Sequence, residues 1–289
     1  MRPRVLFSHG NSFPGGTYRV MLDNLRQRGF EVQAIDRFGH DPQYPVTNNW
    51  PHLVDQLADT TRQWQGDGEP AFLVGHSLGG ILSLMCAAKY PELARGVLLL
   101  DSPILGGWRA TTLGLIKQTQ LVGSLSPGRI SRKRRNHWPD RAAVLEHLQH
   151  KKAFARWDHQ VLADYVDHGT QEIDGQRWLR FDRDIETAIY NTLPDNLVGL
   201  LRRHPLKCPV AFIGGTHSVE MRTVGMDLTQ RLTKGRVMML DGSHLFPMEK
   251  PLATNQVEFH LLRMDAIITS MTAVERTRPA IINAKRKIR

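Results

Sequence analysis

Cysteine is scarce in this chain of 289 residues, which holds only Cys86 and Cys208. Two cysteines this far apart give neither a disulfide framework nor the paired spacing of a zinc site. Each is expected to be a small buried hydrophobic residue. Thirteen histidines are present, but His147 and His150, for example, lack the i, i+4 spacing around a carboxylate that marks a helical metal site. We therefore expect neither disulfides nor a metal centre.

Long apolar runs are also missing. No stretch has the length of a membrane span, and Met1 to Arg4 leads directly into the apolar Val5-Leu6-Phe7 without the pattern of a signal peptide. The length and the 41 % hydrophobic content are enough for one sizeable core and one large insertion. The expectation is a soluble, cytoplasmic protein without a membrane span.

Acidic residues are absent from two strongly basic segments. Residues 129–135 hold five Lys or Arg and residues 276–289 hold six. Removing these eleven from the 38 basic residues leaves 27 against 28 acidic ones. The net charge of +10 therefore comes from one internal segment and one tail around a nearly neutral body. Such segments favour solubility or weak contact with polyanions, so no specific nucleic-acid partner is expected.

A serine lies at the apex of a glycine-rich turn. The apolar run from Ala71 breaks into Gly75-His76-Ser77-Leu78-Gly79, the G-x-S-x-G pattern of a strand that turns sharply into a helix. Small residues let the chain reverse there, so the Ser77 hydroxyl projects outward while the following amides point toward the same spot. An ordinary turn is the alternative, but the helical spacing of apolar residues after Gly79 favours a nucleophile.

Short apolar strands alternate with amphipathic helices up to Asp101, which predicts an α/β fold with a mostly parallel sheet flanked by helices. The alternation then stops for about a hundred residues, where Asp140 to Leu148 and Asp158 to Tyr165 have a helical pattern. We predict a core of residues 1–103 and 198–272, a helical lid of residues 104–197 inserted after the strand ending at Asp101, and a basic tail of residues 273–289.

A serine nucleophile needs a base, and His244 is the best candidate. It lies in the turn Gly242-Ser243-His244 after an apolar strand, where loops at the carboxyl edge of a sheet carry functional side chains. His9 and His76 are weaker candidates, because each adjoins a turn whose backbone has another task.

These pieces together resemble the α/β-hydrolase superfamily. The matching motifs are His9-Gly10-Asn11 after the first strand, Asp36 to His40 after the second, the turn at Ser77 and Gly242-Ser243-His244 near the end. The resemblance implies an oxyanion hole formed by the amides of Leu78 and Asn11. The amide of Ser12 or Phe13 is an alternative to that of Asn11. No cofactor is implied.

The acid of the implied triad is not at the usual place. Most members of the superfamily carry an aspartate shortly after the strand that follows the lid, where this chain has Ser218. Two carboxylates preserve the order serine, acid, histidine: Asp101, where some lipases of the superfamily place their acid, and Glu220. We favour Asp101 over Glu220, although an aspartate that caps a loop is the alternative for Asp101.

Aromatic residues of the predicted lid have two interpretations. They would line an apolar acyl pocket above Ser77, or they would hold the lid together. The residues concerned are Trp108, Trp138, Trp157, Trp178 and Phe181.

The resemblance implies a serine hydrolase, and we predict a carboxylesterase that forms an acyl-enzyme on Ser77 with a small-molecule acyl substrate. The same triad serves thioesters, lactones and carbon–carbon bonds, and the fold alone does not choose among them. A non-hydrolytic or weakly active ligand-binding member is a further alternative, favoured by the displaced acid. Binding of an acidic surface by the basic segments is the third.

Overall fold

A six-stranded parallel sheet forms the centre of the molecule. The computed structural model describes residues 2–66, 68–106, 128–256 and 258. All neighbouring strands are parallel, in the order β2-β1-β3-β4-β8-β9. The strands are β1 (Arg4–Ser8), β2 (Glu31–Ala34), β3 (Ala71–His76), β4 (Ala94–Leu100), β8 (Val210–Gly215) and β9 (Val237–Leu240).

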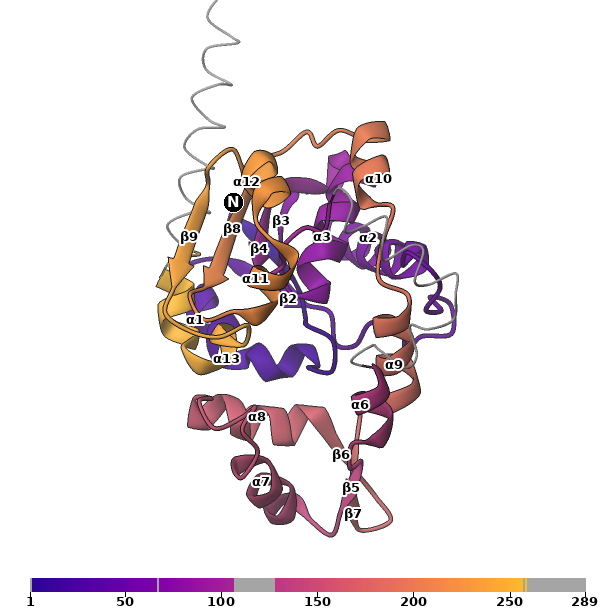
Figure 1. Cartoon of the computed structure of the whole chain (residues 1–289), viewed down its shortest axis with the longest axis vertical. Helices are drawn as coiled ribbons and strands as arrows, with labels where there is room; N and C mark the ends of the chain where they lie inside the picture. Colours follow the sequence, from indigo (N-terminus) through magenta and orange to yellow (C-terminus); the bar gives the residue numbers. More distant parts are fainter. Residues whose placement is uncertain (1, 67, 107–127, 257, 259–289) are drawn as a thin grey trace, which may run out of the picture.

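Helices cover both faces of this sheet (Figure 1). Alternate residues of each strand point to opposite faces, so Phe7 joins one buried cluster with α1, and Leu6 joins the other with α2 and α3. Burial on both faces explains why the strands are almost continuously apolar. The core helices are η1 (Gly15–Tyr18), α1 (Arg19–Gln27), α2 (Pro51–Gln65), α3 (Leu78–Lys89), η2 (Pro91–Leu93), α11 (Val219–Val224), α12 (Asp227–Thr233) and α13 (Phe246–Glu249).

The segment between β4 and β8 is not purely helical, which corrects the prediction of a helical insertion. It contains an antiparallel sheet in the order β5-β7-β6. A hairpin turn at Asp174 and Gly175, with φ of 50° and 72°, joins two of the strands. The elements are α6 (Gly128–Lys133), β5 (His137–Trp138), α7 (Arg141–Gln149), α8 (His159–Gly169), β6 (Thr170–Ile173), β7 (Gln176–Leu179), α9 (Arg183–Asn191) and α10 (Leu197–Arg203).

Much of this inserted segment lies beyond the carboxyl ends of the parallel strands, with α8 between α7 and the core (Figure 1). It is tied to the core by the Arg19 guanidinium, whose Nη2 lies 2.7 Å from Asp164 Oδ1. Helix α10 crosses the boundary predicted at 197/198, and the predicted tail 273–289 lies outside the described residues. The division into core, lid and tail stays a prediction. Within the described ranges, no helix is both long and apolar enough to cross a membrane.

Candidate active site

The turn after β3 places Ser77 in a conformation that few residues adopt. Its φ is 52° and its ψ −116°, and its amide donates to the Leu100 carbonyl at 3.0 Å. The flanking glycines are required by close contact, because a Cβ on Gly79 would lie 2.0 Å from the Ser8 carbonyl oxygen and one on Gly75 would lie 2.2 Å from the Gly79 carbonyl carbon. The local sequence therefore forces the strand to turn directly into α3 with Ser77 between them.

Ser77, His244 and Asp101 lie within hydrogen-bond distance of one another in that order. His244 Nε2 is 3.0 Å from Ser77 Oγ, and His244 Nδ1 is 2.6 Å from Asp101 Oδ2. A carboxylate accepts, so Nδ1 carries the proton and Nε2 presents its lone pair to the serine hydroxyl. This is the arrangement in which an imidazole removes a proton from a serine.

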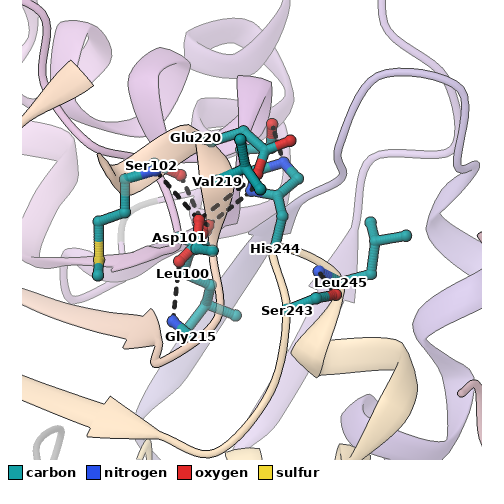
Figure 2. A network of polar contacts seen from close by, with 12 residues as sticks. Leu100, Asp101, Ser102, Gly215, Val219, Glu220, Ser243, His244 and Leu245 are labelled. Atoms are coloured by element: carbon teal, nitrogen blue, oxygen red, sulfur yellow. Dashed lines mark hydrogen bonds and ion pairs between the residues drawn. The ribbon is translucent and has the colours of Figure 1, made fainter. Parts of the chain in front are cut away.

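The carboxylate of Asp101 is buried and surrounded by donors (Figure 2). Besides His244, the Gly215 amide donates to Oδ1 at 2.9 Å and Ser218 Oγ donates to Oδ2 at 2.6 Å. Burial opposes ionisation, but the hydrogen bond and charge of His244 and these further donors outweigh it and lower the pKa of Asp101. Asp101 is therefore an ionised partner for the imidazole at neutral pH.

Glu220 is a poorer partner for the same imidazole. Its Oε2 lies 3.9 Å from His244 Nδ1, and its side chain is half exposed. Ser218, which takes the usual place of the acid, begins α11 as its N-cap and accepts from the Met221 amide at 3.1 Å. The geometry thus gives His244 one close carboxylate, and it comes from the end of β4.

Asp101, Glu220 and His244 also offer three ligand atoms within 4.8 Å of one another. A cation held there would have to displace the hydrogen bond between His244 Nδ1 and Asp101 Oδ2. Since the other oxygen of Asp101 already accepts from the Gly215 amide, the donor set suits a hydrogen-bonded imidazole better than a metal ion.

Two amides near Ser77 have the properties of oxyanion donors. Leu78 is the first residue of α3, so its amide has no partner within the helix. In the loop after β1, the Phe13 amide already donates to the Gly10 carbonyl at 3.1 Å, whereas the described part of the chain provides no acceptor for the amides of Asn11 and Ser12. The oxyanion hole of Leu78 and Asn11 stays a prediction, with Ser12 as its remaining alternative.

A cavity of about 360 Å³ opens above Ser77. Its apolar side is formed by Phe13, Val219 and Leu245 together with the ring of Tyr190, and Glu220 and His217 add polar groups. Of the described residues of the insertion, Tyr190 is the one that lines it.

The aromatic residues that we considered as pocket residues lie elsewhere. Trp138, Trp157 and Phe181 are buried in the two hydrophobic clusters, and Trp178 stacks on His137 with 4.8 Å between ring centroids. These four residues pack within the inserted segment or between it and the core, and none of them lines the described cavity. Trp108 lies outside the described residues.

His9 and His76 are engaged with other groups. The ring of His9 bonds to the Gly10 carbonyl and the Phe38 amide, and burial lowers its pKa to about 4. His76 bonds to Tyr18 and to the main chain of His244, and burial together with the charge of His244 lowers its pKa to about 3. Both rings are neutral at pH 7, and neither has a free nitrogen to offer to Ser77.

One residue of the basic segment 129–135 is not a solvated charge. Arg134 Nη1 contacts both oxygens of the buried Glu186 carboxylate, at 3.2 and 3.0 Å, and Arg134 Nη2 donates to Tyr165 Oη at 2.8 Å. The carboxylate of Glu186 also accepts from the Ser12 hydroxyl, and its main-chain carbonyl accepts from Asn11 Nδ2 at 3.1 Å. The loop after β1 is thereby attached to the insertion.

Sequence reasoning missed Ser218 and Tyr190 as site residues. Ser218 was identifiable as a helix N-cap, but its bond to Asp101 depends on β4 and β8 being neighbours. Nothing in the sequence around Tyr190 indicates that α9 reaches the cavity.

Comparison with known proteins agrees with the fold. Residues 5–257 match the model of the Alpha/beta hydrolase family, and the chain belongs to this family. It is 27 % identical over 144 residues to a monoglyceride lipase homolog of monkeypox virus, a match that covers 44 % of this chain and 51 % of that protein. The chain thus spans about half the length of this relative. It is 25 % identical over 302 residues to a serine hydrolase-like protein of Dictyostelium discoideum, covering 92 % of this chain and 77 % of that protein.

Solved structures are similar over most of the chain. The crystal structure of E-2-(acetamidomethylene)succinate hydrolase has a TM-score of 0.70 at 23 % identity and covers 90 % of this chain and 91 % of its own. A thioesterase domain from the curacin biosynthetic pathway has a TM-score of 0.64 at 20 % identity, over 89 % and 90 % of the two chains. At these identities the likeness establishes the fold alone.

Proposed function

We propose that the protein is a serine hydrolase that works through an acyl-enzyme on Ser77. His244 Nε2 takes the proton of the Ser77 hydroxyl as its oxygen attacks the substrate carbonyl. Asp101 holds the proton on Nδ1 and stabilises the imidazolium that results. The amides of Leu78 and Asn11 donate to the oxyanion of the tetrahedral intermediate.

The second half of the reaction uses the same groups. The imidazolium gives its proton to the leaving oxygen, which departs and leaves the acyl group on Ser77. Water then enters, and His244 removes its proton as the water oxygen attacks the acyl carbon. The bond from that carbon to Ser77 Oγ breaks, the imidazolium returns its proton to Oγ, and the carboxylic acid leaves.

The bond that we propose is a carboxylic ester. The apolar wall of Phe13, Val219 and Leu245 suits a hydrocarbon acyl chain, and a cavity of about 360 Å³ suits a chain of small to medium length. Relatives named as monoglyceride lipases, such as that of the rat with 30 % identity over 128 residues, covering 43 % of this chain and 42 % of that protein, favour ester chemistry.

The observation that carries the proposal is the unbroken sequence of contacts from Asp101 Oδ2 through His244 to Ser77 Oγ, at 2.6 and 3.0 Å. A ligand-binding protein that had lost the chemistry would have no need for a buried, ionised aspartate aligned with the imidazole.

Hydrolysis of p-nitrophenyl esters of increasing chain length by wild type, Ser77→Ala, Asp101→Asn and Glu220→Gln tests this function. We expect activity on short or medium chains, its loss in Ser77→Ala, and a fall in kcat on the order of 10⁴-fold in Asp101→Asn. Glu220→Gln should keep activity close to that of wild type.

An inactive wild type on every chain length would contradict the esterase. Thioester, lactone and carbon–carbon substrates would then be tested with the same four proteins, since the triad serves each of these bonds.

A further inference from the structure

A buried chain of hydrogen bonds joins three loops of the candidate site. His76 Nε2 lies 2.9 Å from the His244 carbonyl oxygen, and His76 Nδ1 lies 2.7 Å from Tyr18 Oη. The Gly10 amide donates to the same Tyr18 oxygen at 3.0 Å. This chain of hydrogen bonds therefore runs from the loop after β1, through the end of β3, to the loop after β9.

The direction of every bond in this chain is fixed. A carbonyl only accepts, so His76 carries its proton on Nε2, and its Nδ1 accepts from the Tyr18 hydroxyl. The Tyr18 oxygen in turn accepts from Gly10. Tyr18 and His76 are only 2 % and 0 % exposed, so water does not compete for these groups.

The neutral state of His76 fits this arrangement. Burial first, and then repulsion by His244, lowers its pKa to about 3. A protonated ring would leave the Tyr18 hydroxyl without its acceptor and would place a positive charge beside the imidazolium that forms on His244.

The groups around this chain of hydrogen bonds are closely packed. A Cβ on Gly10 would lie 2.8 Å from His76 Nδ1 and 3.1 Å from Tyr18 Oη, so glycine is needed there for the bonds to form. The Tyr18 ring is also held from its other side by Phe7, with 4.6 Å between ring centroids.

We infer that His76 and Tyr18 are positioning residues for the reaction proposed above, on which this inference rests. His76 directly precedes Ser77, so the ring that holds the His244 main chain belongs to the same tight turn as the nucleophile. Asp101 holds the side chain of His244 and His76 holds its carbonyl, which fixes the imidazole from two sides. Through Tyr18, the same ring fixes Gly10 and hence the neighbouring Asn11 amide.

Kinetics of Tyr18→Phe, His76→Leu and His76→Gln test the inference. Misplacement of reacting groups by a fraction of an ångström lowers rates, so we expect kcat to fall about 10- to 100-fold in Tyr18→Phe and His76→Leu, with KM nearly unchanged. Glutamine retains a donor toward the His244 carbonyl, so His76→Gln should keep more activity than His76→Leu.

Tyr90→Phe is the matched control. It also removes one tyrosine hydroxyl that donates to a partner, Asp55 of α2 at 2.8 Å, but neither residue lines the cavity. It should retain the kcat of wild type. A folded Tyr18→Phe protein, judged by circular dichroism and thermal melting, with the kcat of wild type would overturn the positioning role.

The tautomer of His76 provides a readout that does not depend on activity. Long-range ¹H–¹⁵N spectra of histidine-labelled protein, with His76 assigned from its loss in His76→Gln, should show the proton on Nε2, and Tyr18→Phe should shift the Nδ1 resonance. An active wild type with the His76 proton on Nδ1 would contradict the positioning role of His76 and Tyr18 but not the proposed function. An inactive wild type with the His76 proton on Nε2 would contradict the proposed function but not the hydrogen bonds of His76.

Discussion

Asp101 Oδ2 accepts two hydrogen bonds of 2.6 Å, one from His244 Nδ1 and one from Ser218 Oγ. Ser218, which stands at the usual place of the acid, thus donates to the carboxylate that we propose as the acid. Because a carboxylate that accepts several bonds keeps its negative charge and its orientation, Ser218 helps to hold Asp101 against the imidazole.

We expect Ser218→Ala to lower kcat by roughly 10-fold, since a hydrogen bond to a charged group contributes about 1.5 kcal/mol. Ser218→Thr retains a hydroxyl and should recover most of the activity. Steady-state kinetics on the best p-nitrophenyl ester measure both. Equal activity of Ser218→Ala and wild type would show that the bond to Asp101 has no part in the reaction.

Phe13 should limit the length of the acyl chain. It lines the cavity and packs on Trp157 and Tyr165, with ring centroids 5.5 and 5.7 Å away. Phe13→Ala opens the cavity toward these rings, so the preferred ester should become longer and kcat/KM on short esters should fall about 10-fold.

Phe154→Ala is the control for this change. Phe154 lies in the same aromatic cluster, 4.7 Å from Trp157 between ring centroids, but does not line the cavity. Both variants should lose stability, whereas only Phe13→Ala should change the order of preference along the ester series. An unchanged order in Phe13→Ala would place the acyl chain elsewhere.

Stability should fall as the pH drops from 6.5 toward 4. Burial lowers the pKa of His9 to about 4 and that of His76 to about 3, from an ordinary value of 6.5. In this window the unfolded chain binds protons that the folded protein does not, so acid favours unfolding by up to about 1.4 kcal/mol per pH unit for each ring. Urea unfolding at several pH values measures the slope. The free energy of unfolding should depend less steeply on pH in His76→Gln than in wild type. Equal slopes in the two proteins would mean that His76 is not held neutral.

Loss of Arg134 should destabilise the protein through Glu186. Arg134→Met leaves a buried carboxylate without its partner, which costs about 3 kcal/mol in the free energy of unfolding. The exposed Arg132, 3.9 Å from Asp184, is the control, and Arg132→Met should change stability by less than about 0.5 kcal/mol. Denaturant unfolding measures the free energy of unfolding of the two variants. If the basic segment were simply solvated, Arg134→Met and Arg132→Met would both lose little stability.

The parallel sheet and its flanking helices could be predicted from the sequence because each strand is apolar and each helix amphipathic. The inserted hairpin was missed, since its strands have only four residues each and carry polar side chains. Asp174-Gly175 between them is nevertheless a strong signal for a tight hairpin turn. Helical periodicity alone was too coarse to find it.

The proximity of Ser77 and His244 could be predicted from their turns, whereas Asp101 could be favoured over Glu220 only through the resemblance to some lipases. Both carboxylates have the right order in the chain. Only the pairing of β4 with β8, in which Leu100 lies opposite Ile213, brings Asp101 beside Gly215 and Ser218. A contact across a sheet depends on strand order, which local sequence patterns do not contain.

Mass spectrometry of the protein after reaction with a fluorophosphonate tests whether Ser77 is the nucleophile. We expect one phosphonyl adduct on the peptide that contains Ser77, no adduct in Ser77→Ala, and much slower labelling in Asp101→Asn. Failure of the folded wild type to react, or an adduct on a residue other than Ser77, would contradict this role of Ser77.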